Sequence, residues 1–159
     1  MRILNFLLTI TGFGILEITF LNYFKLFLVK PDLLLLGVIS VSLFLDLKSV
    51  LVFAILSGIF KDVYSLGQFG IHTILFCLWG FTMVELSRKI SLDDNWMRLL
   101  VVLIVALLDN IILGLSRVYA GSVIPLGIFL RTVFLSSIYS TLFFPAVFQL
   151  IKRIPLNSR

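Results

Sequence analysis

Cysteine, histidine and charge are scarce in this chain, and each scarcity argues against a class of function. The single cysteine, Cys77, cannot form an internal disulfide, and the single histidine, His72, falls short of the several nitrogen or sulfur ligands that protein metal sites use. No serine or thiol stands in the context of an activated nucleophile, and no G-x-x-x-x-G-K loop is present to hold nucleotide phosphates. We therefore expect no enzyme, no cofactor and no metal.

Apolar residues, in contrast, are in large excess. They make up 60% of the 159 residues, and the mean hydropathy is +1.17. Soluble domains contain roughly 45–50% apolar residues. No polar segment is long enough for a separate soluble domain, so we expect one transmembrane domain over residues 1–159. The net charge of +5 comes from basic residues at the ends of apolar runs, where membrane proteins carry topology signals, and does not indicate nucleic-acid binding.

Six apolar runs follow one another, separated by turns or charged loops. They are Ile3–Phe24, Leu33–Leu45, Ser49–Tyr64, Ile71–Leu86, Leu99–Ser116 and Leu126–Ile151. A membrane-spanning helix needs roughly 20 residues, so the pattern predicts an all-α integral membrane protein, a bundle of six transmembrane helices. The first run follows Arg2 as a signal peptide would, but Glu17 interrupts it and no small-x-small cleavage site follows, so we expect it to be retained.

The second and third runs are short and need a separate interpretation. One helix through both would exceed a hydrocarbon core of roughly 30 Å and would put Asp46 and Lys48 near its middle. A tight hairpin of two short helices is therefore predicted. A re-entrant pair of helices is the alternative that the sequence leaves open.

Six spans would place both termini on one side of the membrane. With the termini inside, eight Lys and Arg residues lie in inner segments and four in outer segments. The inner set is Arg2, Lys48, Arg88, Lys89, Arg98, Lys152, Arg153 and Arg159, and the outer set is Lys25, Lys30, Lys61 and Arg117. Because Lys and Arg accumulate in cytoplasmic loops, we expect both termini to be cytoplasmic.

Five ionisable residues interrupt the apolar runs and form the candidate site. They are Glu17, Asp62, His72, Asp109 and Arg131. In the expected topology all five fall in the outer half of the membrane or at its border, and charged side chains in lipid normally face a bundle interior or a wet cavity. Two interpretations stay open: a structural role, with Asp109 and Arg131 as a neutralising pair, or an outward-facing cavity for a headgroup or solute.

Small residues recur at four-residue spacing in the third run. Ala54, Gly58 and Asp62 share one helix face, and such a face lets two helix backbones approach closely. The face predicts packing against a neighbouring helix. That neighbour can belong to the same bundle or to a partner protein.

Residues 31–80 resemble the bacterial rod shape-determining protein MreD family. Three stretches carry the resemblance: Pro31-Asp32-Leu33-Leu34-Leu35, Gly58-Ile59-Phe60-Lys61-Asp62 and Leu66-Gly67-Gln68-Phe69-Gly70. The last departs from the family, which often has a proline before the later glycine of that turn. The chain length agrees with the family, whereas the first, fifth and sixth runs match in hydropathy alone.

The resemblance implies more than the residues do by themselves. It implies a non-enzymatic subunit of the bacterial plasma (inner) membrane that belongs to the machinery of cell-wall elongation. The subunit would act as a scaffold for MreC and for peptidoglycan synthase and transglycosylase subunits. The implied fold is similar to that of the substrate-binding subunits of energy-coupling-factor transporters. A solute-binding membrane subunit of such a transporter is therefore the alternative function.

Overall fold

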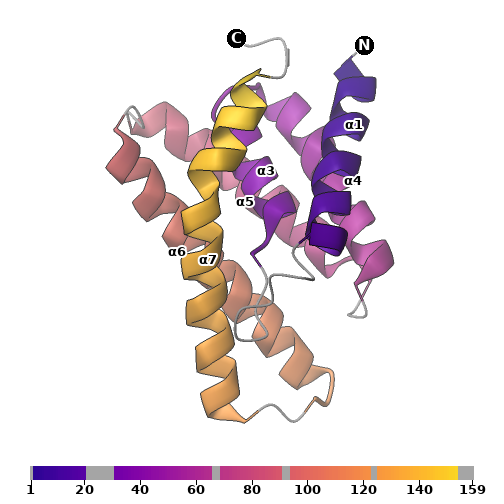
Figure 1. Cartoon of the computed structure of the whole chain (residues 1–159), viewed down its shortest axis with the longest axis vertical. Coiled ribbons are helices and arrows are strands. Elements are labelled where there is room, and N and C mark those ends of the chain that lie inside the picture. Colours follow the sequence, from indigo (N-terminus) through magenta and orange to yellow (C-terminus); the bar gives the residue numbers. More distant parts are fainter. Residues whose placement is uncertain (1, 21–30, 66–68, 91–93, 123–124, 154–159) are drawn as a thin grey trace.

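The computed structural model describes residues 2–20, 31–65, 69–90, 94–122 and 125–153, and helices make up most of this length (Figure 1). The elements are α1 (Arg2–Ile15), the π-helical turn η1 (Leu16–Phe20), α3 (Leu33–Ser42), α4 (Leu47–Tyr64), α5 (Ile71–Lys89), α6 (Asn95–Tyr119) and α7 (Leu126–Arg153). No strand occurs in the described residues. The predicted all-α fold is thus confirmed, and each of the six apolar runs contains one helix.

Helix ends differ from the apolar runs in a consistent way. α5 continues to Lys89, three residues beyond the apolar run, and α6 begins four residues before its run, at Asn95. Helical hydrogen bonds join backbone groups and do not require apolar side chains, so a helix can be longer than its apolar stretch. α3 is the exception, because it ends at Ser42, three residues before the predicted Leu45.

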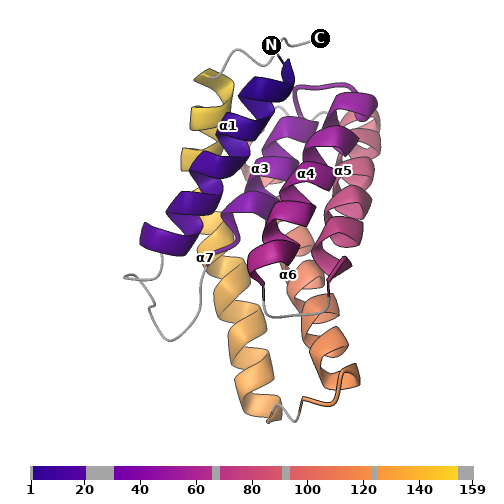
Figure 2. The ribbon, with the colours of Figure 1, turned by 90° about the vertical axis from the view of Figure 1, so that its right-hand side faces the viewer.

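α3 is the centre of the molecule. All ten of its residues are buried, and it contacts α1, α4, α5, α6 and α7. At 1.5 Å per residue, a helix of this length is about half as long as a hydrocarbon core is thick. The chain reverses over residues 43–46, and α3 and α4 lie side by side as the predicted hairpin (Figure 2).

The helices alternate in direction, so that α1 begins and α7 ends at the same end of the molecule (Figure 2). The end of α3, the start of α4, the end of α5 and the start of α6 lie at that end too, whereas the end of α6 and the start of α7 lie at the opposite end, where these two helices extend beyond the others. Two helices of the described chain, α6 and α7, are long and apolar enough to cross a membrane.

Apolar side chains form both the core and much of the surface. Phe53 of α4 and Phe76 of α5 are fully buried with the leucines of α3, and the Phe6 ring of α1 meets the Phe53 ring edge-on at 5.5 Å. Outward, Val63 is 72% exposed and Leu142 of α7 is also 72% exposed. Large apolar side chains on the outside suit lipid as the solvent.

Candidate functional site

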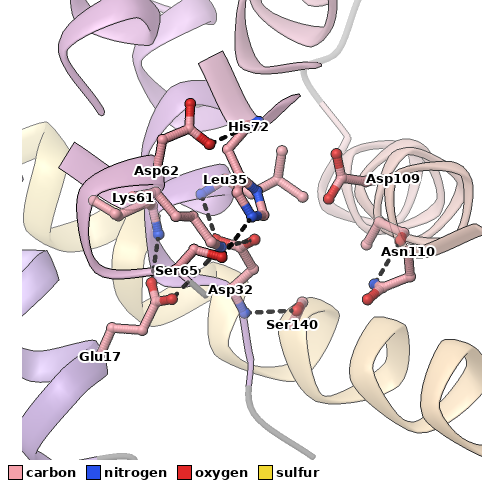
Figure 3. Close-up of polar contacts among 12 residues, drawn as sticks. Glu17, Asp32, Leu35, Lys61, Asp62, Ser65, His72, Asp109, Asn110 and Ser140 are labelled. Carbon is pink, nitrogen blue, oxygen red and sulfur yellow. Dashed lines mark hydrogen bonds and ion pairs between the residues drawn. The ribbon is translucent and has the colours of Figure 1, made fainter. Parts of the chain in front are cut away.

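A buried lysine organises the polar centre of the molecule. Lys61 lies on the last turn of α4, and its side chain is only 10% exposed. Its Nζ lies 3.5 Å from Glu17 Oε1, also pairs with Asp32 Oδ2, and sits over the Phe76 ring, 5.5 Å from its centroid (Figure 3). The ammonium group thus joins η1, the start of α3, α4 and α5. We call Glu17, Asp32 and Lys61 the charged triad.

Both carboxylates of the triad also satisfy the N-terminus of α3. Asp32 is the N-cap residue, and its Oδ1 accepts a hydrogen bond of 3.0 Å from the Leu35 N–H. Glu17 Oε2 accepts one of 3.3 Å from the Leu34 N–H. The first N–H groups of a helix lack internal partners and carry a partial positive charge, so carboxylates stabilise this end. The backbone N–H of Asp32 in turn donates to Ser140 Oγ of α7, at 3.1 Å.

Asp62 plays a similar part at the N-terminus of α5. Its carboxylate accepts hydrogen bonds from the His72 N–H (3.1 Å), the Thr73 N–H (3.1 Å) and the Thr73 hydroxyl (2.6 Å). Gly70, the residue before α5, has φ = 96°, a backbone conformation that favours glycine. Asp62 therefore ties the end of α4 to the start of α5.

His72 is buried beside this cap. Its Nε2 lies 3.4 Å from Ser65 Oγ, while its Nδ1 has no hydrogen-bond partner among the described residues. Its ring also meets the Phe76 ring at 6.2 Å. Within the described part of the chain, no group of three or more His, Cys, Asp and Glu side chains is arranged to hold a metal ion.

Asp109 and Arg131 are not paired with each other, contrary to the structural interpretation of the sequence. Asp109 is fully buried on α6, and its Oδ1 accepts a hydrogen bond of 2.8 Å from Trp79 Nε1 of α5. The Arg131 side chain is exposed on α7. The pairing was predicted because both residues lie at the same depth on neighbouring helices. Depth does not say which way each side chain points around its helix, and in the structure Asp109 points toward α5. The α6–α7 polar contact is instead Asn110 Nδ2 to Ser137 Oγ, at 3.4 Å.

The small-residue face of α4 lies against α5. A Cβ on Gly58 would collide with the backbone of Thr73, and Ala54 is fully buried with its Cβ near Gly80 of α5. The close approach of these backbones lets Asp62 reach the Thr73 N–H. The face is therefore occupied within the molecule.

The structure gives the five ionisable residues different bonding partners. Glu17 joins the charged triad, Asp62 and His72 share the start of α5, and Asp109 bonds to Trp79 at the α5–α6 contact, all within reach of the charges of Asp32 and Lys61 (Figure 3). The Arg131 side chain is exposed on α7. Sequence reasoning did not include Asp32 or Lys61 among the candidate site residues. Lys61 was counted with the cations of the outer segments, but its side chain is buried in ion pairs. Its position after an unbroken apolar run and directly before Asp62 is the signal that could have identified it.

In the described part of the chain, the helices enclose buried charges, large apolar side chains face outward, and two helices are long and apolar enough to cross a membrane, a combination that suits a helical membrane protein. The sequence model described as rod shape-determining protein MreD matches residues 1–154, and the chain therefore belongs to the MreD family, a membrane protein family with a role in rod-shape determination. No curated protein and no solved structure gives a significant match. The match confirms the resemblance and extends it to the helices that matched in hydropathy alone.

Proposed function

We propose that the protein is a non-enzymatic scaffold in the cell-elongation machinery, holding MreC and, through it, peptidoglycan synthase and transglycosylase subunits. The family membership supports the shape-determining role, and the charged triad is the observation that supports a scaffold. In the triad, the buried charges form ion pairs with one another, and the carboxylates accept hydrogen bonds from the α3 N-terminus. Such bonding fixes the relative positions of four elements, as a docking platform for other membrane proteins requires.

The proposal includes six membrane crossings with both termini in the cytoplasm. The common end of α1 and α7 supports it, because Lys48, Arg88, Lys89, Lys152 and Arg153 lie in helix ends there. Lys61 is buried in ion pairs, but the exposed Arg131 near the start of α7 joins Lys25, Lys30 and Arg117 in the outer set. The Lys and Arg count in the sequence therefore still favours the end with the termini.

Cysteine labelling in whole cells tests this topology. Ile90→Cys and Ser122→Cys, each in a Cys77→Ala background, place thiols at exposed positions at opposite ends of the molecule. An impermeant maleimide should label Ser122→Cys in intact cells and should label Ile90→Cys only after permeabilisation. The reverse pattern would overturn the orientation, and labelling of both in intact cells would overturn the six-span arrangement.

Purification from the native membrane tests the scaffold. The tagged chain in mild detergent should carry MreC in a stable complex that native mass spectrometry detects with a defined stoichiometry. A tagged multi-helix membrane protein of similar size and unrelated function is the control and should carry none. Absence of MreC from the purified protein under conditions that keep it folded would contradict the proposal.

The alternative, a solute-binding subunit of an energy-coupling-factor-type transporter, draws support from one observation. Buried ionisable groups lie at the polar centre of the molecule, and His72 Nδ1 among them has no partner in the described chain. A transport subunit should retain a small solute through purification and should co-purify with an ATPase. The internal bonding of the charged triad supports this alternative less than it supports a scaffold.

A further inference from the structure

A second polar feature lies far from the charged triad, at the end of the molecule that holds both termini. α6 and α7 touch through Asn110 and Ser137, and a Cβ on Gly114 would meet the Phe129 ring. Toward Asn95 and Lys152 the two helices separate (Figure 1). A cavity of about 450 Å³ lies between these helix ends, within the range of about 300–1,000 Å³ that small-molecule sites occupy.

The cavity has an apolar part and a cationic part. Leu99, Phe144 and Phe148 supply apolar lining, and Arg98 and Lys152 supply positive charge. The Arg98 guanidinium lies 5.0 Å from the centroid of the Phe148 ring, which limits the orientations of its charged group. A binding site with this lining favours a ligand that combines an anionic group with an apolar chain.

Two further features shape the site. Asn95, the first residue of α6, also lines the cavity and offers an amide side chain, while the helix N-terminus itself is capped by Asp94. Pro145 lies inside α7 and cannot donate a backbone hydrogen bond, so the carbonyl four residues earlier loses its helical partner and the helix surface becomes irregular there. The carboxylate of Asp94, the N-cap residue, accepts from the Trp96 N–H at 3.4 Å.

The place of the cavity indicates where the ligand comes from. The exposed Trp96 follows Asn95, and tryptophan concentrates at the level of lipid headgroups. Lys152 and Arg153 end α7 at the same level. Basic pockets between transmembrane helices on the cytoplasmic side suit anionic lipid headgroups.

We propose that this cavity binds an anionic phospholipid of the adjacent leaflet, with its phosphate near Arg98 and Lys152 and an acyl chain along Phe144 and Phe148. This proposal does not depend on the proposed binding of MreC, because the lipid would bind to the chain directly. A lipid held between α6 and α7 would complete the packing where the two helices separate.

Native mass spectrometry of the purified full chain in detergent tests the proposal, with dioleoyl phosphatidylglycerol and dioleoyl phosphatidylcholine as probes. The wild-type chain should retain the anionic lipid about tenfold better than the zwitterionic one, and the double variant Arg98→Gln/Lys152→Gln should lose most of that preference. The matched control is Lys48→Gln/Lys89→Gln, which removes two exposed cations at the same end outside the cavity. It should bind like the wild type.

A second variant tests the apolar part without changing charge. Gln149 lines the cavity and is exposed, so Gln149→Trp should fill part of the space while leaving the cations in place, and lipid retention should fall. Equal retention by all variants would overturn the proposal, as would equal losses in the cavity and control variants, which would indicate surface attraction only. Binding of glycerol 3-phosphate as tightly as of the phospholipid would also overturn it, because the ligand would then be a free phosphate.

Discussion

Two cations of this protein each lie over a phenylalanine ring, yet their surroundings differ. Lys61 lies 5.5 Å from the centre of the Phe76 ring, and the chain itself supplies the carboxylates of Glu17 and Asp32. Arg98 lies 5.0 Å from the centre of the Phe148 ring, beside an open cavity. A buried cation must find its counter-charge within the protein, whereas a cation beside an open cavity is also within reach of water or of a ligand.

The short helix α3 and the long helices α6 and α7 are stabilised in different ways. The charged triad stabilises α3, a helix too short to span lipid by itself, by satisfying its N-terminus inside the bundle. α6 and α7 are long and apolar enough to be held by lipid and by packing along their middle. The N-terminus of the short helix is therefore bonded to buried carboxylates, whereas the long pair meets through the neutral side chains of Asn110 and Ser137.

The largest expected effect is at the triad. Lys61→Met would leave Glu17 and Asp32 buried without their counter-charge, and breaking a buried ion pair costs about 3–5 kcal/mol. The melting temperature in detergent should fall steeply. Lys48→Met, at an exposed position of the same helix, is the control and should change it little.

A triple variant checks the cause of that loss. Lys61→Met with Glu17→Gln and Asp32→Asn removes all three charges, and Asn remains a good N-cap residue. This variant should recover much of the stability lost by Lys61→Met alone. If it melts lower still, the lysine stabilises the fold through packing of its stem and not through charge.

The next largest effect concerns the α4–α5 contact. Gly58→Leu would put a side chain where the Thr73 backbone lies and would pull Asp62 away from the start of α5. Overpacking costs about 1–3 kcal/mol or more, so the folded yield in detergent should drop well below that of the control variant Ile59→Leu. Ile59 follows Gly58 in the chain, and its side chain is exposed. Equal yields would mean that α4 and α5 can separate without loss.

A smaller effect is expected at Asp109. Trp79→Phe keeps a ring in place but removes the N–H donor, and a buried acceptor left without its partner costs about 1–3 kcal/mol. In a double-mutant cycle with Asp109→Asn, the two losses should not add. Asp109→Asn and Arg131→Gln should lower the stability additively when they are combined. Strong coupling between these two substitutions would show that Asp109 and Arg131 do pair, contrary to the structure.

The smallest effect completes the comparison. In detergent without added lipid, Arg98→Gln/Lys152→Gln should change the free energy of unfolding by no more than about 0.5 kcal/mol per substitution, as is usual for surface positions. Added phosphatidylglycerol should raise the melting temperature of the wild-type chain more than that of this variant. A large loss of stability without lipid would mean that Arg98 and Lys152, like Lys61, stabilise the fold itself.

Much of the fold was predictable because it depends on local sequence. The six helices follow from the apolar runs, and Gly70 marks the start of α5, whereas the early end of α3 at Ser42 did not follow because its apolar run continues to Leu45. The burial of Glu17, Asp62 and Asp109 also followed from their places inside apolar runs. The hairpin of α3 and α4 followed from length alone, since one helix through both would be too long for the membrane.

The pairing of side chains depended on the tertiary structure. The sequence by itself determined the number and order of the helices, the apolar character of their surface and the presence of charges inside the apolar runs, because these properties follow from composition and spacing along one chain. Only the packing of the helices decided that Lys61 turns inward to Glu17 and Asp32, that Asp109 meets Trp79 and that α3 is enclosed on all sides. These contacts depend on the rotation of each helix about its axis, and that rotation is set by how the side chains of several helices fill a shared space.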